Sequence, residues 1–272
     1  MDQDKIEKLQ KIVDESSNIV FFGGAGVSTE SGIPDFRSQD GLYRQQWSYP
    51  PETIISHSFF LKNTKDFYRF YTQKMIALDA KPNAAHLKLA ELEKAGKLTS
   101  VVTQNIDGLH QKAGSQHVWE LHGSVLRNYC QKCHAFYSAK DIIDLCKCGG
   151  SLTNQPGIHA ECSIPYCNHK DIKDTSKICG GLIKPDVVLY EEGLNDSIMS
   201  GAIKDISKAD TLIVGGTSLI VYPAAGLINY FHGKNIVLIN KSSTNADSKA
   251  DLIIHDSIGK VLEQIKVNCI TN

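Results

Sequence analysis

The sequence predicts an α/β fold, in which a doubly wound parallel β-sheet is covered by helices on both faces. Short apolar runs alternate with amphipathic segments along most of the chain. A glycine-rich turn follows the first apolar run, and a cysteine-rich stretch interrupts the alternation. The 272 residues, 42% hydrophobic and 22% charged, are enough for a well-buried core in one large domain, or in a large domain with a small one attached.

The first half of the chain supplies helices and strands in turn. Residues 4–15 carry Ile6, Leu9, Ile12 and Val13 at helical spacing, which predicts a helix with one buried stripe. Gly96 fits the stop signal at the C-terminal end of a helix. The expected elements are strands at 18–24, 98–105 and 118–123, and helices at 65–78 and 84–96.

The second half resumes the alternation after an interruption. Expected strands lie at 209–218, 234–240 and 250–255, with helices at 196–208, 222–232 and 257–267. Before them, a stretch rich in cysteine has few apolar runs, so we expect a small domain inserted into a large one. The predicted boundaries are 1–127 and 182–272 for the large domain and 128–181 for the small domain.

Polar or glycine-rich sequences follow several expected strands, where ligands bind in a doubly wound sheet. The turn at 23–26 is typical of dinucleotide binding, but Thr29 stands where the third glycine of that fingerprint would lie. Taken singly, such features are more often structural. His122 alone is more often a structural histidine than a base, and Asn105 or Asp107 would serve as helix caps. Their convergence on one edge of the sheet indicates a ligand site.

Five longer sequences occur in a recognisable order: GAGVSTESGIPDFRS, TQNIDGLH, ELHG, KPDVVLYEE and GTSLIVYPAAGL. Together they resemble the sirtuin family of NAD-dependent protein deacylases, over about residues 5–265 apart from part of the cysteine-rich stretch. The resemblance implies a Rossmann-like NAD-binding domain with a small zinc-binding domain inserted. It also implies a bacterial-type deacetylase, which removes acetyl groups from lysine while NAD is cleaved to nicotinamide and O-acetyl-ADP-ribose.

The resemblance assigns roles to individual residues. His122 matches the general base, a role that suits an imidazole titrating near neutral pH. Asn105 matches the residue that positions the ribose and assists cleavage, and Asp107 the residue that receives the carboxamide of nicotinamide. The cofactor-binding residues that the resemblance implies are Ala25, Gly26, Thr29, Phe36, Arg37, Gln104, Asn105, Ile106, Asp107, His122, Gly216, Thr217, Ser218, Asn240 and Ile258.

The resemblance further implies that an acetyl-lysine protein or peptide binds as an added strand between 187–192 and 216–219, with Val188 lining the acyl-lysine tunnel. Family members that remove succinyl or malonyl groups carry a Tyr and an Arg three residues apart after the cofactor loop. Here that segment has Tyr49 and no Arg at that distance. Deacetylation is therefore the expected activity, together with some longer unbranched acyl groups.

The resemblance also implies a structural zinc ion in the small domain, held tetrahedrally by two cysteine pairs. Cys130 and Cys133 form the first pair. Two arrangements complete the site, and they draw on Cys146, Cys148 and Cys179. In one, the pair is Cys146 with Cys148; in the other, Cys179 joins one of them. The intervening residues could bind a second metal or be plain thiols, and they are Cys162, Cys167, His159 and His169.

Charge and hydropathy limit the partners and the location. A net charge of -1 predicts no direct binding to nucleic acid, and no apolar run reaches the roughly 20 residues of a membrane span. The first residues lack the apolar core of a signal peptide, so we expect a cytoplasmic protein. Two other functions stay open: mono-ADP-ribosyl transfer or NAD hydrolysis at the same bond, and a non-catalytic module that binds NAD or a protein partner.

Overall fold

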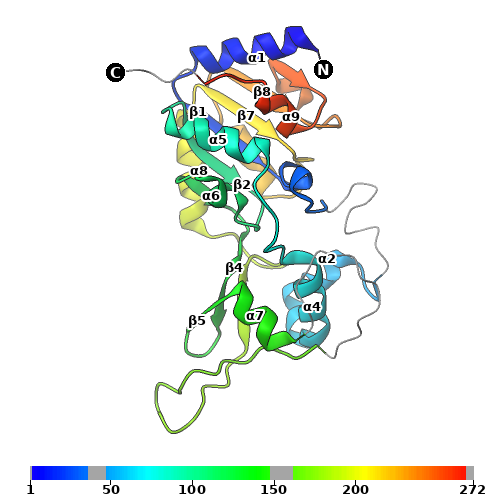
Figure 1. Cartoon of the computed structure of the whole chain (residues 1–272), viewed down its shortest axis with the longest axis vertical. Helices are drawn as coiled ribbons and strands as arrows, with labels where there is room; N and C mark the ends of the chain where they lie inside the picture. The colour runs from blue at the N-terminus through cyan, green and yellow to red at the C-terminus, as the bar shows by residue number, and fades with distance from the viewer. Residues whose placement is uncertain (1, 36–46, 148–161, 268–272) are drawn as a thin grey trace.

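The main sheet has six parallel strands in the order β3-β2-β1-β7-β8-β9 (Figure 1). The structure is a computed structural model that describes residues 2–35, 47–147 and 162–267. The strands are β1 (Ile19–Gly23), β2 (Leu98–Thr103), β3 (Val118–Glu120), β7 (Thr211–Gly215), β8 (Asn235–Ile239) and β9 (Leu252–Ile254). Chain order reverses between β1 and β7, which places a ligand crevice beyond the carboxyl ends of these two strands. The predicted doubly wound α/β fold is confirmed.

Helices cover both faces of this sheet because its strands are apolar on both sides. Helices α1 (Gln3–Glu15), α5 (Ala84–Lys94) and α9 (Ile258–Glu263) pack on one face, and α8 (Asp196–Lys208) and the 3-10 helix η5 (Ala224–Tyr230) pack on the other. Adjacent residues of β1 point in opposite directions, so Phe21 joins the first core and Phe22 the second. The four stripe residues expected in α1 are all buried.

Several expected helices are present with altered ends. The expected helix at 65–78 is α4 (Thr64–Phe70) followed by a π-helical turn, η4 (Tyr71–Met75). The expected helix at 257–267 ends early, at Glu263. Helix α5 stops as predicted, because Gly96 adopts a φ of +72°, in the left-handed region that favours glycine.

A second, smaller unit lies beside the main sheet, at the lower end of Figure 1. Its antiparallel sheet has the order β5-β4-β6, with β4 (Gly123–Cys130), β5 (Phe136–Ser138) and β6 (Ile183–Val187). Helices α2 (Pro51–Ile54), α3 (His57–Lys62), α4 and α7 (Ala139–Cys146) share one apolar core with it. Residues 54–76 therefore pack with the cysteine-rich stretch, although they precede it by about fifty residues in sequence. The domain boundaries at 128 and 181 stay a prediction.

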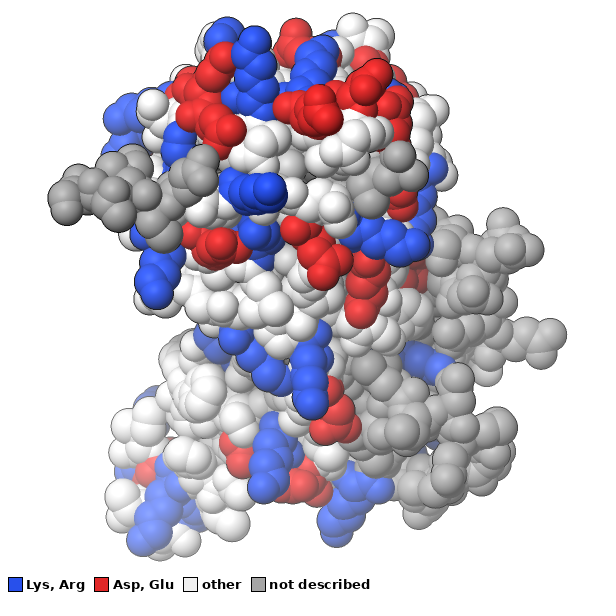
Figure 2. All heavy atoms as spheres, turned by 45° about the horizontal axis from the view of Figure 1, so that its top comes forward, with Lys and Arg blue, Asp and Glu red and all other residues white. Residues whose placement is uncertain are grey.

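The surface carries both signs of charge. On the face shown in Figure 2, the described Lys and Arg side chains are interspersed with Asp and Glu. This mixture gives the face no extended field of one sign. No helix within the described ranges is long and apolar enough to cross a membrane.

Two histidines are buried together where α5 and α6 (Leu109–Ala113) pack against each other. The ring centroids of His86 and His110 are 4.7 Å apart, and the two side chains are fully or almost fully buried. His86 Nε2 and both ring nitrogens of His110 have no hydrogen-bond partner among the described residues. Burial lowers the pKa of His86 to about 4 and that of His110 to about 3. Both rings are therefore neutral in the folded protein at pH 7.

This histidine pair should make the protein sensitive to mild acid. Below pH 6.5 both histidines become protonated in the unfolded chain but stay neutral in the folded chain. The free energy of unfolding is therefore greatest above that pH and falls as the pH drops toward 4. The loss per histidine is about 1.4 kcal/mol per pH unit, or roughly 4–5 kcal/mol for the pair between pH 6.5 and 4.5. Urea unfolding at pH 6.5 and at pH 4.5 measures this loss of stability. A His110→Phe variant should lose clearly less stability over the same interval, whereas an unchanged slope would contradict the assignment.

Candidate functional site

Two glycine turns touch at the point where the strand order reverses. The turn after β1 contains the 3-10 segments η1 (Ala25–Val27) and η2 (Thr29–Ser31), and Gly26 N donates to Gly216 O at 2.8 Å. A Cβ atom on Gly26 would lie 2.8 Å from the Gly216 backbone, and one on Gly216, where φ is +61°, would lie 2.4 Å from Val27 N. Both positions therefore require glycine. Thr29 Oγ1 donates to Gly26 O at 3.0 Å, so Thr29 closes this turn where a third glycine would stand in the dinucleotide fingerprint.

A chain of hydrogen bonds joins three predicted cofactor residues across the crevice. Gln104 Nε2 donates to Thr217 Oγ1 at 3.0 Å, and Thr217 N donates to Asn240 Oδ1 at 2.9 Å. Asn240 Nδ2 is buried and has no partner among the described residues. A buried donor of this kind is usually satisfied, so it fits an acceptor supplied by a ligand. Together with the glycine turns, this edge of the sheet suits the phosphates and ribose of a dinucleotide such as NAD.

A second network holds the residues expected on the nicotinamide side. Ser28 Oγ donates to Asp107 Oδ2 at 2.6 Å and accepts from Asn105 Nδ2 at 3.0 Å. Asp107 Oδ1 also accepts from Leu109 N at 2.9 Å, at the start of α6. Ser28 is buried and links both predicted residues. The sequence interpretation missed this serine, although its place between Gly26 and Thr29 in the same motif was the available signal.

His122 lies just beyond β3 with one ring nitrogen fixed and the other free to act as a base. Its Nδ1 lies 3.0 Å from Gln104 O, and a carbonyl oxygen only accepts, so Nδ1 carries the proton and Nε2 keeps its lone pair. Burial lowers the pKa of His122, partly opposed by the hydrogen bond to Gln104. The His122 carbonyl accepts from Val188 N at 3.0 Å, which places the expected tunnel residue beside the expected base.

The remaining predicted cofactor residues occupy the same edge or lie outside the described ranges. Ile258 begins α9 and is buried against the end of β7, where a Cβ on Gly215 would lie 2.1 Å from its Cδ1. Ser218 is exposed directly after Thr217, and Ala25 opens η1. Ile106 follows Asn105, and its carbonyl accepts from Val125 N at 2.9 Å. Phe36 and Arg37 lie outside the described residues.

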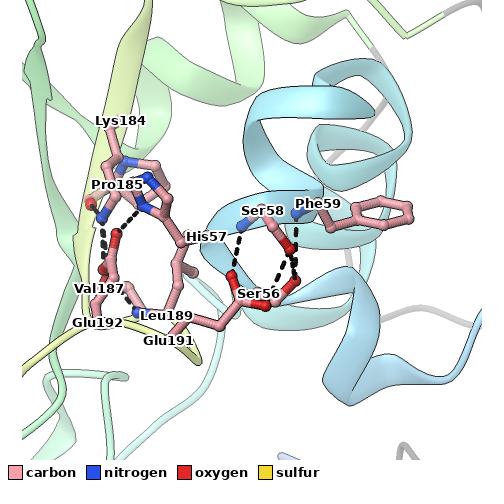
Figure 3. A network of polar contacts seen from close by, with 10 residues as sticks. All are labelled: Ser56, His57, Ser58, Phe59, Lys184, Pro185, Val187, Leu189, Glu191 and Glu192. Atoms are coloured by element: carbon pink, nitrogen blue, oxygen red, sulfur yellow. Dashed lines mark hydrogen bonds and ion pairs between the residues drawn. The ribbon is translucent and has the colours of Figure 1, made fainter.

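The segment after β6, one side of the expected peptide site, is fastened to α3 by two glutamates (Figure 3). The Glu192 carboxylate binds His57 Nδ1 at 2.7 Å, Leu189 N at 2.9 Å and Lys184 Nζ at 3.1 Å. Burial opposes ionisation, but these contacts outweigh it and lower the pKa of Glu192. Glu191, at a φ of +76°, accepts from Ser58 N at 2.8 Å and from Ser58 Oγ at 2.9 Å. These contacts hold the backbone between Val188 and Glu192 in one conformation.

Four cysteines come together at the far end of β4. The Sγ atoms of Cys130, Cys133, Cys167 and Cys179 all lie within 4.8 Å of one another. Pairs are 3.7 Å (Cys130 to Cys179) and 3.5 Å (Cys133 to Cys167) apart, far beyond a disulfide bond. Four sulfurs held tetrahedrally around zinc would be roughly 3.8 Å apart, given Zn–S bonds of about 2.3 Å. Cys130 Sγ accepts from Lys132 N and from Cys133 N, both at 3.4 Å, and this N–H donation favours the thiolate form of Cys130.

The second half of this site corrects the sequence interpretation. The sequence interpretation expected Cys146 or Cys148 in the second pair, but Cys167 lies there instead. A short antiparallel ladder, in which Tyr166 pairs with Leu182 and Lys170 with Ile178, accounts for this position. This ladder brings Cys167 beside Cys179, with Cys167 N donating to Gly181 O at 2.8 Å. Cys146 instead belongs to the apolar stripe of α7, and burial raises its pKa to about 12, so its thiol stays protonated in the core.

Two further cysteines of the prediction fall elsewhere. Cys148 lies outside the described residues, as does His159. Cys162 is disulfide-bonded. Because Cys167 belongs to the four-cysteine group, neither Cys162 nor Cys167 is left to bind the second metal that the sequence allowed.

The sheet order, the glycine turns at the reversal point and the unpartnered Asn240 donor define a Rossmann-type dinucleotide-binding protein with an attached cysteine-metal module. The model of the Sir2 family matches residues 24–223, and the chain belongs to this family. A relative from Clostridium acetobutylicum, named NAD-dependent protein deacetylase, is 59% identical over 96% of this chain and 98% of its own. A Staphylococcus aureus relative of the same name is 41% identical over 96% of this chain and 97% of its own.

Solved structures agree over nearly the whole chain. A Sir2 protein with deacetylated p53 peptide and 3′-O-acetyl-ADP-ribose superposes with a TM-score of 0.81, at 34% identity, over 95% of this chain and 96% of that one. A Sir2 complex with p53 peptide and NAD+ gives 0.78, at 35% identity, with the same coverage. The sirtuin resemblance and the predicted fold are therefore confirmed.

Proposed function

We propose that this protein is an NAD-dependent protein lysine deacetylase. It converts acetyl-lysine, NAD and water to lysine, nicotinamide and O-acetyl-ADP-ribose. The observation that carries the proposal is the convergence of His122, Asn105 and Asp107 beside touching glycine turns at the reversal point of the sheet. The names of the relatives and the ligands of the solved Sir2 structures point to the same reaction.

The contacts of individual residues support the following roles. Asn240 and Thr217 hold the phosphate and ribose side of NAD, and Asn105 with Asp107 holds the nicotinamide side. When bound, NAD supplies the ribose carbon that the acetyl oxygen attacks. His122 Nε2, the free ring nitrogen of a neutral imidazole, takes a proton from a ribose hydroxyl. The Nδ1 proton is held by Gln104 O, and burial lowers the pKa of the ring. His122 is therefore neutral, with the Nε2 lone pair available, near neutral pH.

The peptide lies along the segment that Glu191 and Glu192 hold rigid, with its acetyl-lysine side chain passing Val188. Because this contact uses backbone groups, the preference for sequence around the lysine is loose. The proposal includes a zinc ion in the four-cysteine group, where it stabilises the small unit. It also includes a cytoplasmic location, since NAD and acetylated protein substrates are intracellular.

Mass spectrometry of an acetyl-lysine peptide incubated with the purified protein, with and without NAD, tests the reaction. The expected result is a loss of about 42 Da from the peptide that requires NAD, with nicotinamide and O-acetyl-ADP-ribose as products. NAD consumed while the acetyl group stays in place would replace deacetylation by ADP-ribosyl transfer or NAD hydrolysis. Peptides with longer acyl chains serve as the comparison, and a faster reaction on them would change the assigned acyl group.

A further inference from the structure

The Asn83 side chain lies between α5 and the η1–η2 turn (residues 24–31), and each of its polar atoms is used. Its Oδ1 accepts from Ala85 N at 3.0 Å and from His86 N at 3.4 Å, which makes Asn83 the N-cap of α5. Its Nδ2 donates to Val27 O at 2.7 Å and to Ser31 Oγ at 3.0 Å. A single amide group therefore caps a helix and holds both 3-10 segments of the turn.

The helix that presents this side chain is a rigid base. Ala85, Leu89 and Leu92 of α5 are completely buried against the main sheet. His86 completes a capping box, because its Nδ1 accepts from Asn83 N at 3.3 Å, and its ring packs on His110. Packing on both sides of α5 fixes the place of the Asn83 amide, so the turn is held against a tightly packed helix.

The two contacts of Asn83 lie on either side of the residue that organises the nicotinamide side. Val27 precedes Ser28 directly and Ser31 follows it by one short turn. Ser28 in turn bonds both Asp107 and Asn105. A shift of the turn would carry Ser28 with it and would break the hydrogen-bond geometry of both side chains.

We propose that Asn83 is a positioning residue for NAD binding, acting through the η1–η2 turn and Ser28. It touches none of the reacting atoms, and its part is to place Asn105 and Asp107 where they meet the nicotinamide half of NAD. The inference rests on the proposed function for the identity of the ligand. It predicts that the two halves of the Asn83 amide are separable: the oxygen stabilises the helix, and the NH2 group sets the affinity for NAD.

The substitution Asn83→Asp separates them. Aspartate caps a helix about as well as asparagine. However, it has no NH2 group, and its second oxygen would face the Val27 carbonyl across 2.7 Å. Because the helix cap is kept, the loss of two hydrogen bonds should lower the melting temperature of the free protein by only roughly 2–6 °C. The Kd of NAD by calorimetry and the inhibition constant of nicotinamide should rise at least about fivefold, while KM for the peptide changes little.

A second asparagine cap provides the matched control. Asn195 caps α8 by accepting from Ser197 N at 2.9 Å and Ile198 N at 3.2 Å, away from the turn. Asn195→Ala should lower the melting temperature without raising the Kd of NAD. A wild-type Kd of NAD in Asn83→Asp overturns the proposal, and so does an equal rise in the Kd of NAD in Asn195→Ala. Calorimetry needs no turnover, so a wild type that binds NAD but leaves acetyl-lysine intact would contradict the proposed function alone.

Discussion

His122→Ala is expected to lower kcat/KM for an acetylated peptide by roughly 10³, a loss typical of removing a general base. The substitution leaves no group in place of Nε2, whose lone pair is free because Nδ1 donates to Gln104 O. The phosphate-side contacts at Thr217 and Asn240 do not involve this ring. The Kd of NAD, measured by calorimetry, should therefore change by less than about threefold while turnover is lost.

His117→Ala is the matched control. His117 lies just before β3, whereas His122 lies just beyond it, and the His117 side chain is 74% exposed, with its Nδ1 3.5 Å from Glu93 Oε1. This variant should keep wild-type kcat/KM. Residual activity near the wild-type level in His122→Ala would remove His122 from the reaction and leave the base unassigned.

The pH dependence of kcat/KM offers an independent check on His122. A base acts when deprotonated, so activity should fall on the acid side only, and the lowered pKa places that fall below the ordinary value of about 6.5. The His86–His110 pair destabilises the protein over the same range. Initial rates therefore need a parallel measurement of folding at each pH.

The sequence predicted well those features that depend on a local periodic pattern of apolar residues. Four apolar residues at helical spacing gave the buried face of α1, and apolar runs followed by polar residues located the ends of β1, β2 and β7. The polar residues that follow these strands come together as predicted, because the carboxyl ends of parallel strands meet at one edge of the sheet. Even within the cysteine-rich stretch, α7 had a local signal, the capping box formed by Ser138 and Asp141, which was overlooked.

The features that the sequence could not supply depend on contacts between distant segments. His86 and His110 meet because α5 and α6 pack together, and nothing in either local pattern pairs them. Ser28 gains its importance from Asn105 and Asp107, which lie nearly eighty residues away. The second cysteine pair was mistaken for the same reason. Cys146 and Cys148 are close in sequence, whereas Cys167 and Cys179 become neighbours only when the ladder between 166 and 182 forms.

The zinc site supplies the other large expected effect. Cys167→Ala should reduce the zinc content of the purified protein from about one ion per chain to a small fraction, because three thiolates hold zinc far more weakly than four. Metal binding in such modules contributes directly to folding, so the small unit should unfold at a much lower temperature. Zinc content by atomic emission and melting by circular dichroism measure both effects.

Cys146→Ala separates this ligand set from the alternative that the sequence offered. Cys146 is completely buried in the apolar core, so its substitution should cost some stability but leave the zinc content unchanged. Loss of zinc in Cys146→Ala with retention in Cys167→Ala would reverse the assignment. Residues 123–130 of β4 separate His122 from the cysteine group, and a strand of that length, at about 3.3 Å per residue, holds the two at opposite ends of a span of up to roughly 26 Å. Zinc at this distance acts on the reaction only through the folded state of the small unit. Chelation should therefore lower the activity in step with the loss of the small unit's share of the helical signal, while the helices on the main sheet remain.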